Sequence, residues 1–329
     1  MKTKLTSIFL LFVLFLQAQS FPPQVGISGT TAIYKDDTRF MDWANAVSVT
    51  RGYLDIAFPD NGFADYGAEN NAIGQPNNNV VSLGDGGTAI LTFNHPITNG
   101  QGADFAIFEN GFLQEDGSEM AFLEFAFVEV STDGVEYVRF PAISEIPSNT
   151  QIESFGFINA RNVHNLAGKY IANYGTPFDL SDLNNLIQGT TVNLNNINYI
   201  KLIDVVGTVN PSFATYDNQN NIVNDPYPTA FSSGGFDLDA VGVIHNTTTT
   251  NINDEYLTRI SIYPNPVKDL VKVLGKQKVL IMELFSLNGK RLQVVRNSTV
   301  LNTDNLEKGV YFLRVKTESK TSTFKLVKR

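Results

Sequence analysis

The stretch FLEFAFVEVSTDGVEYVRF, residues 122–140, decides the fold of the larger part of the chain. From Phe122 to Val130 every residue is apolar except Glu124 and Glu129, which is typical of a strand buried on both faces. The residues after it, Thr-Asp-Gly at 132–134, favour a tight turn, and residues 136–140 read as the returning strand. The stretch therefore predicts a β-hairpin in the core of the body.

The rest of residues 21–245, called the body from here on, is also β-rich. Further apolar or alternating stretches predict strands, at 88–93, 104–109, 197–206 and 236–244. Helical patterns are weak, and long loops rich in Asn, Gly and Pro separate the strands. About 225 residues is within the range of one all-β domain, so we expect a β-sandwich or jelly roll.

Charge divides the chain sharply. Residues 21–254 hold 27 acidic and seven basic residues, a net charge of −20, whereas residues 255–329 hold six acidic and 15 basic residues, a net charge of +9. The seam is the polar stretch within residues 246–255, which predicts a linker. The acidic body is a poor partner for nucleic acid, whose phosphates need Lys and Arg. The absence of Cys excludes disulfides, zinc–thiolate sites and a lipid-modified N-terminal Cys.

The basic tail, residues 256–329, reads as short strands with turns every 8–12 residues, which predicts a small immunoglobulin-like β-sandwich. Four motifs follow one another in it: YPNP at 263–266, LFSLNGK at 284–290, LEKGVYF at 306–312 and a basic end from Lys325. Together they resemble the type A C-terminal sorting domain of the type IX secretion system of Bacteroidota.

This resemblance implies that residues 256–329 are the partner of the type IX secretion machinery. It also implies export across the outer membrane, removal of the domain, and release or attachment to surface polysaccharide. The alternative is an ordinary terminal immunoglobulin-like domain without a sorting role.

The N-terminus, residues 1–20, predicts a secretory signal peptide. Lys2 and Lys4 precede an apolar run from Leu5 to Leu16, and small polar residues follow it. The alternative, a membrane anchor, would need about 20 apolar residues, and no later segment is apolar enough to span a bilayer. We therefore expect a secreted or outer-surface protein with no transmembrane segment in its mature form.

Four blocks of the body carry a second resemblance. They are VVSLGDGG at 80–87, ADFAIFENG at 103–111, FVEVSTDG at 127–134 and GGFDLDAV at 234–241. They are similar to a bacterial cell-surface family whose order resembles a galactose-binding-like, discoidin-type jelly roll. The resemblance implies a fold, and it assigns no catalytic residue.

Several carboxylates of the body occupy positions on apolar strands. Asp237 and Asp239 alternate with apolar residues, and Asp104 and Glu109 flank an apolar strand. Buried carboxylates need a partner, bases are scarce, and oxygen-rich sites without counter-cations suit calcium. We therefore predict calcium binding through some of these four acids. The alternative is that structural hydrogen bonds satisfy these acids, with Asp237 and Asp239 capping loops. Asp204 lies on an apolar face and is not among the predicted ligands: it either supports a ligand or is merely buried, with backbone N–H groups, Lys201 or Arg139 as its partner.

The sequence leaves three functions open. It contains no zinc-binding His pair, no nucleophile elbow and no phosphate-binding loop. Aromatic residues in or near polar loops favour a non-catalytic binding or adhesion protein, with a glycan as ligand. These residues are Trp43, Tyr53, Tyr66, Tyr174, Tyr216 and Tyr227. The alternatives are a polymer hydrolase using a carboxylate pair and a purely structural surface protein.

Overall fold

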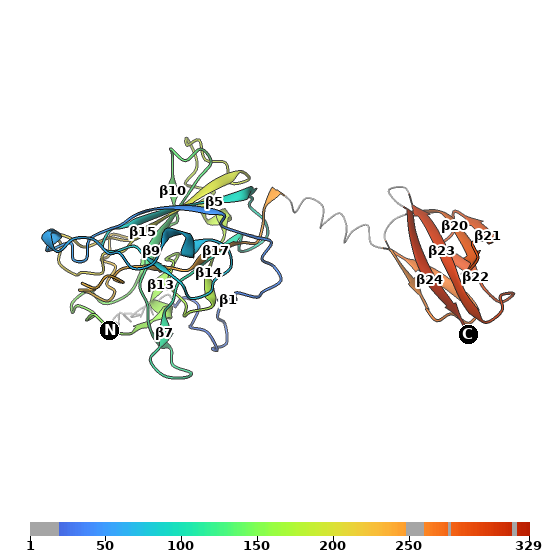
Figure 1. Ribbon diagram of the computed structural model, residues 1–329, viewed down its shortest axis with the longest axis horizontal. Helices are drawn as coiled ribbons and strands as arrows, with labels where there is room; N and C mark the ends of the chain where they lie inside the picture. Colours follow the sequence, from blue (N-terminus) through green and yellow to red (C-terminus); the bar gives the residue numbers. More distant parts are fainter. Residues whose placement is uncertain (1–19, 248–259, 276–277, 318–320) are drawn as a thin grey trace, which may run out of the picture. The chain divides into compact units, whose positions relative to one another are not determined.

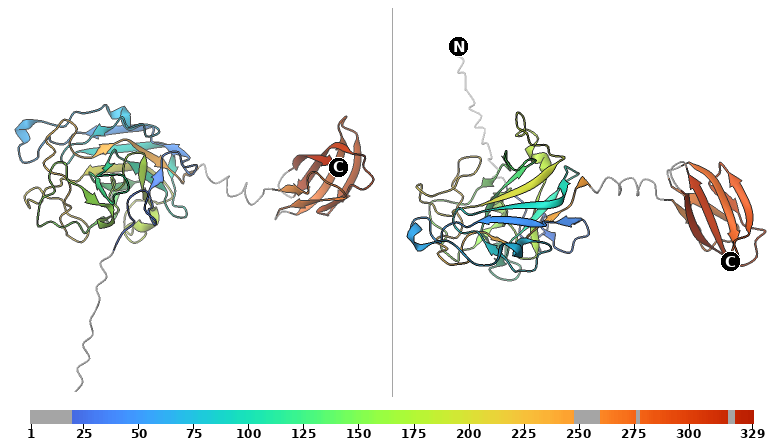
Figure 2. Two further views of the ribbon diagram at one scale, coloured as in Figure 1. Left: turned by 90° about the horizontal axis from the view of Figure 1, so that it is seen from below. Right: turned by 45° about the horizontal axis from the view of Figure 1, so that its top comes forward.

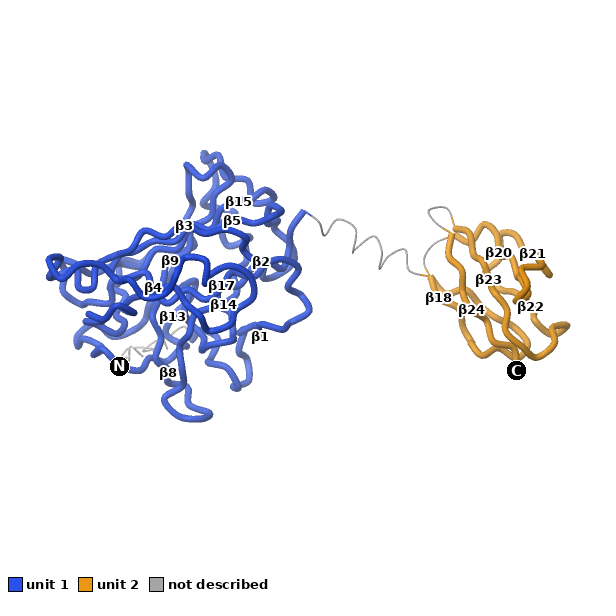
Figure 3. The backbone as a smooth tube through the Cα atoms, in the orientation of Figure 1, with its two compact units in different colours: residues 1–247 blue, residues 248–329 orange. Residues whose placement is uncertain are grey.

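The computed structural model describes residues 20–247, 260–275, 278–317 and 321–329. All but the last residue of the predicted signal peptide lies outside these ranges, as does most of the predicted linker. The chain divides into two compact units, residues 1–247 and 248–329, which Figure 3 shows in blue and orange. This boundary falls within residues 246–255. Within the described ranges, no helix has the length and hydropathy of a membrane span.

Two five-stranded antiparallel sheets form the frame of the body (Figure 1). In spatial order, the first contains β1 (Ile33–Tyr34), β14 (Tyr174–Phe178), β6 (Phe105–Phe108), β17 (Ala240–Val243) and β2 (Asp42–Trp43). The second contains β10 (Val138–Arg139), β9 (Ala126–Ser131), β15 (Ile197–Asp204), β5 (Thr88–Ile97) and β3 (Ala46–Thr50). The prediction of an all-β fold is confirmed, and the jelly-roll order of the strands stays a prediction.

One apolar core lies between these two sheets. It combines Leu91, Val128 and Leu202 of the second sheet with Phe105 and Val241 of the first. All five side chains are fully buried. Side chains alternate across a strand, so the two sheets bury one face each against the other and form a sandwich.

Smaller elements surround this sandwich, and long loops connect them (Figure 2). Three minor sheets pair β4 (Val81–Ser82) with β16 (Asp237–Leu238), β11 (Ile143–Ser144) with β13 (Val163–His164), and β8 (Met120–Phe122) with both β7 (Phe112–Leu113) and β12 (Ile158–Asn159). The described helical segments are single 3₁₀ turns, η1 (Pro59–Asn61), η2 (Glu69–Ala72), η3 (Ala160–Asn162) and η4 (Leu180–Leu183).

The predicted hairpin is present, but its first strand is interrupted. β9 and β10 pair antiparallel, with Val130 opposite Val138 and Glu129 opposite Arg139. The residues from 123 to 125, which we expected to continue the strand, separate β8 from β9. The Phe125 N–H bonds the Asp225 carboxylate at 3.1 Å instead of a neighbouring strand. The interruption places Glu124 at a junction between two sheets.

The predicted strand 236–244 is likewise interrupted, at Asp239. β16 ends at Leu238 and pairs with β4, whereas β17 begins at Ala240 and pairs with β6 and β2. The Asp239 N–H donates to the Phe108 carbonyl at 3.1 Å. We expected Asp237 and Asp239 to project from the same side of one strand. Because the strand is interrupted, the two side chains lie in different surroundings.

The tail unit is a separate, smaller β-sandwich. One sheet contains β18 (Ser261–Tyr263), β19 (Leu270–Leu274) and β22 (Val300–Asn302), and the other contains β21 (Arg291–Arg296), β20 (Val279–Ser286), β23 (Gly309–Thr317) and β24 (Thr321–Lys328). Its own core joins Val271 and Leu301 of the first sheet to Met282, Leu313 and Leu326 of the second. Each unit thus has an apolar core of its own.

Candidate metal centre

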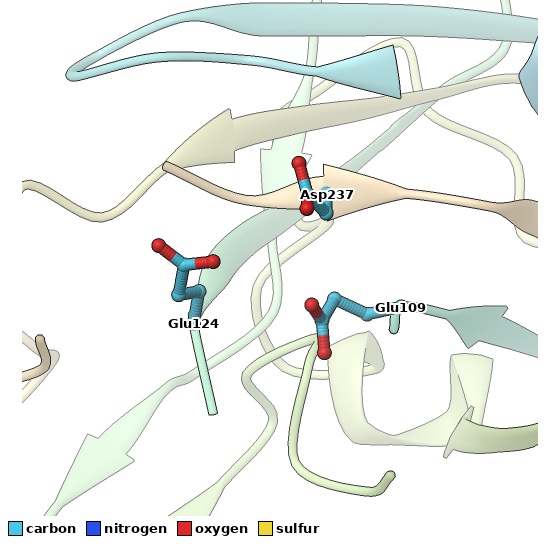
Figure 4. A group of neighbouring side chains, drawn as sticks. All are labelled: Glu109, Glu124 and Asp237. Carbon is cyan, nitrogen blue, oxygen red and sulfur yellow. The ribbon is translucent and has the colours of Figure 1, made fainter. Parts of the chain in front are cut away.

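Three buried carboxylates of the body meet at one point. One oxygen each from Glu109, Glu124 and Asp237 lie within 4.8 Å of one another. Figure 4 shows the three side chains directed toward one common space. They are 1%, 5% and 6% exposed, respectively. We call this group the carboxylate trio.

The surrounding chain fixes the positions of Glu109 and Asp237. Glu109 directly follows β6, and its Oε2 accepts the Gly111 N–H at 2.7 Å. Residue 111 must be glycine here, because a Cβ would lie 2.6 Å from the Phe122 carbonyl oxygen. Asp237 accepts hydrogen bonds from the Ser82 hydroxyl and, at 2.9 Å, from the Asn110 amide.

Two further buried acids hold the backbone beside the trio. Asp225 accepts the N–H of Phe125, the residue after Glu124, at 3.1 Å. Asp204 accepts the N–H of Phe236, the residue before Asp237, at 2.7 Å, and also that of Gly86 at 2.9 Å. Backbone N–H groups thus satisfy Asp204, as one of the alternatives for this residue supposed.

Burial and mutual repulsion make the ionised trio costly. Burial, followed by the charge of Asp237, raises the pKa of Glu109 well above its ordinary value. The same two causes raise the pKa of Glu124, to which the charge of Glu109 adds. Burial also raises the pKa of Asp237 to about 6. Two like charges at this spacing repel by about 3–4 kcal/mol at an effective dielectric constant of 20.

No basic side chain among the described residues forms an ion pair with the trio. The ion pairs of the body's Lys and Arg residues go to Asp37, Glu119 and Glu129. Arg51 lowers the pKa of Asp237 by its charge, but its guanidinium donates to the carbonyls of Ser82, Tyr66 and Gly67. The trio must therefore be compensated by protons or by a cation that is not part of the chain.

An unpartnered oxygen favours a cation. Glu109 Oε1 is buried and has no hydrogen-bond partner among the described residues. A buried acceptor without a partner costs about 1–3 kcal/mol, so native structures rarely keep one. The donor set is entirely oxygen, which suits calcium, and it lacks the nitrogen and sulfur ligands that zinc prefers. Two ligands of one calcium ion lie at most about 5.2 Å apart, so three oxygens within 4.8 Å of one another can share one ion.

The structure brings together two of the four predicted metal ligands, Glu109 and Asp237. Asp104 instead accepts the N–H groups of Gly100 and Leu180, each at 2.7 Å, and lies 2.7 Å from His245 Nδ1. Asp239 accepts the N–H groups of Asn77 and Asn78, each at 3.1 Å. The oxygens of both residues therefore already have donors within the fold.

The sequence did not single out Glu124 as a ligand. It stands out there only as one of two acids within an otherwise apolar strand pattern. The other, Glu129, pairs with Arg139 at 2.8 Å and Lys201 at 3.3 Å. The sequence offered one signal for Glu124 as a ligand: it is an acid within an apolar stretch, and no basic residue among those described pairs with it.

The aromatic residues that the sequence singled out are scattered. Trp43 packs on Phe40 and Phe108, with ring centroids 4.8 and 5.7 Å away. Tyr227 donates its hydroxyl to Asp55 at 2.8 Å. Tyr66 is 53% exposed and Tyr216 is 40% exposed. Tyr53 and Tyr174 each pack on one neighbouring ring.

Comparison with known proteins identifies the tail. Residues 261–329 match the family described as secretion system C-terminal sorting domain. No curated protein sequence matches the chain. One similar solved structure is entitled "The structure of CBM51-2 and INT domains from Clostridium perfringens ZmpB"; it is 10% identical, with 89% of this chain and 83% of that chain covered. The TM-score is 0.17, too low to indicate a shared fold.

The predicted sorting domain is thus confirmed over most of its predicted range. A chain that carries such a domain is addressed to the secretion machinery that the domain serves. The predicted localisation is confirmed with it: this protein, with its secretion system C-terminal sorting domain at residues 261–329, is secreted or attached to the outer cell surface.

Proposed function

We propose that the chain is a non-catalytic binding or adhesion protein of the outer cell surface, exported by the type IX secretion system, and that one calcium ion at Glu109, Glu124 and Asp237 stabilises its body. The observation that carries the calcium centre is the buried, unpartnered Glu109 Oε1, which belongs to a trio of carboxylates within 4.8 Å of one another. The sorting domain supports export.

The ion would join three segments that are far apart in the sequence. Glu109 and Glu124 flank the β7–β8 hairpin, and Asp237 lies in β16. A ligand that binds only the folded chain stabilises it by mass action. Extracellular calcium modules have dissociation constants of about 10⁻⁴–10⁻³ M, so an exported protein can be saturated by its surroundings.

Burial of the trio favours binding over hydrolysis at this centre. A glycosidase needs two carboxyl groups that reach a glycosidic bond from two sides. Here each carboxylate is at most 6% exposed, so a polymer chain has no access to a pair of them. The hydrolase alternative therefore gains no support from the carboxylate trio.

Bound calcium, measured by atomic absorption, tests the proposal. At equilibrium dialysis against calcium at about ten times the dissociation constant, the full chain is expected to hold about one calcium per molecule in excess of the dialysate. Glu124→Gln is expected to lose it, because one of the three charged ligands is gone. Glu115→Gln, a matched change at an exposed position of the β7–β8 loop, should retain it. A chain without calcium, or Glu124→Gln with a full load, contradicts the centre.

A further inference from the structure

Five phenylalanine rings form a connected row on the surface of the body. In order of contact they are Phe157, Phe112, Phe122, Phe155 and Phe231, with successive centroids 6.3, 5.1, 6.4 and 5.7 Å apart. The rings at positions 112, 155 and 231 are 51%, 67% and 47% exposed. The loop after β7, next to Phe112, projects away from the rest of the body (Figure 1). We call these five residues the aromatic row.

An uncharged cavity of about 350 Å³ continues the aromatic row at its Phe157 end. Phe157 lines this cavity together with ten other residues, none of which carries a charge. Asn149 and Asn162 are among the residues that line it, and Asn149 is exposed. An uncharged lining suits an uncharged ligand better than an ion, and residues 21–254, with a net charge of −20, disfavour an anion in particular.

Two other cavities in the described part of the chain differ in this respect. One of about 480 Å³ is lined by Arg39, Lys169 and Asp182, among others. The other, of about 510 Å³, includes Glu145. Neither of these two is lined by a residue of the aromatic row.

We propose that the cavity and the aromatic row form a binding site for an uncharged polysaccharide, with one sugar unit in the cavity and further units over the rings. Sugar rings have apolar C–H faces, which pack on flat aromatic rings, and hydroxyl groups, which both donate and accept hydrogen bonds. A side-chain amide likewise donates and accepts, so Asn149 and Asn162 match hydroxyl groups. The negative body repels acidic polymers. This inference rests on the binding role proposed above and adds its ligand class and place.

Three rings of the aromatic row are close in sequence to members of the carboxylate trio. Phe112 lies three residues after Glu109, Phe122 two residues before Glu124, and Phe231 six residues before Asp237. Each of these segments thus carries one ring of the row and one member of the trio. An ion bound at the trio would therefore fix the three segments that carry these rings relative to one another.

Binding of neutral and acidic oligosaccharides to the full chain in calcium tests the site. A glycan array identifies the tightest neutral ligand, and titration calorimetry gives its dissociation constant. We expect Asn162→Ala and Phe155→Ala each to weaken binding at least tenfold, and Phe155→Tyr, which keeps the ring, to bind within about threefold of the unchanged chain. Phe63→Ala, which removes a ring that is 57% exposed and outside the row, should change binding less than twofold. The melting temperature of each variant confirms that it is folded.

Three results with glycans would overturn the inference: no binding of any neutral glycan, tighter binding of acidic glycans, or neutral binding that Asn162→Ala and Phe155→Ala leave unchanged. Self-association of the chain that Phe155→Ala abolishes would assign the row to a second copy instead, and would also overturn it. Bound calcium is measured on the same samples. A calcium-loaded chain without glycan binding contradicts this site alone, whereas glycan binding by a chain that never takes up calcium contradicts the calcium centre alone.

Discussion

Replacing Phe178 by alanine is expected to lower the free energy of unfolding of the body by about 3–5 kcal/mol. Its ring stacks on Phe105 at 5.3 Å and meets the edge of Phe140 at 5.0 Å, and at most 1% of each of the three side chains is exposed. These three rings come from β14, from β6 and from the residue after β10, so they join the two sheets of the sandwich. Alanine would leave a cavity that the rigid sheets cannot close.

Urea unfolding followed by the fluorescence of Trp43 measures this loss. Trp43 is the single tryptophan of the chain and lies in β2, so the signal reports on the body alone. Phe63→Ala is the control, because 57% of that side chain is exposed and its loss should cost less than about 1 kcal/mol. A cost below 1 kcal/mol for Phe178→Ala would show that the two sheets do not share the core described here.

Calcium is expected to raise the melting temperature of the body by about 5–10 °C at a hundred times its dissociation constant. Mass action at that concentration gives about 2.7 kcal/mol, and each kcal/mol shifts the midpoint of a domain of this size by about 2–4 °C. The tail unit provides an internal reference, since its own core contains none of the trio. In calorimetry of the full chain, the transition of the body should move with calcium while that of the tail stays in place.

Glu124→Gln should change stability in opposite directions with and without calcium. Burial and the neighbouring carboxylates raise the pKa of Glu124, so without metal at pH 7.5 folding must either bury its charge or take up a proton, and both cost free energy. Glutamine does neither, so in chelator the variant should melt at a higher temperature than the unchanged chain. In calcium the variant lacks a ligand and should melt at a lower temperature. The matched exposed variant Glu115→Gln should follow the unchanged chain in both buffers. If Glu124→Gln shifts the midpoint equally in both, the carboxylate has no role in metal binding.

The sequence predicted the elements whose apolar pattern is continuous. Residues 126–131 and 138–139 form the predicted hairpin, and Phe127, which lies in its first strand, is 3% exposed. The pattern failed where a strand passes from one sheet to another. Such a change depends on distant partners, here the Asp225 carboxylate that takes the Phe125 N–H and the Phe108 carbonyl that takes the Asp239 N–H. Neither partner is adjacent in sequence, so periodicity cannot reveal it.

The candidate centre was predicted only in part for the same reason. Alternation identified Asp237 as an acid on an apolar strand, and proximity to an apolar strand identified Glu109. Asp104 and Asp239 have the same pattern, but loop N–H groups satisfy them, and loop conformation is not readable from spacing. Glu124 joins the trio because it lies in the short segment that separates β8 from β9. Only the assembled fold separates the acids that have donors from those that lack them.

A crystal structure of the full chain grown with calcium, with anomalous diffraction data to locate the ion, tests the calcium centre most directly. We predict a single anomalous peak in the body within about 2.3–2.6 Å of Glu109 Oε1 and of carboxylate oxygens of Glu124 and Asp237. The same crystals soaked in chelator should lose the peak. Strong density for the three side chains with no ion between them, or a calcium ion bound at Asp104 or Asp239 instead, would contradict the account.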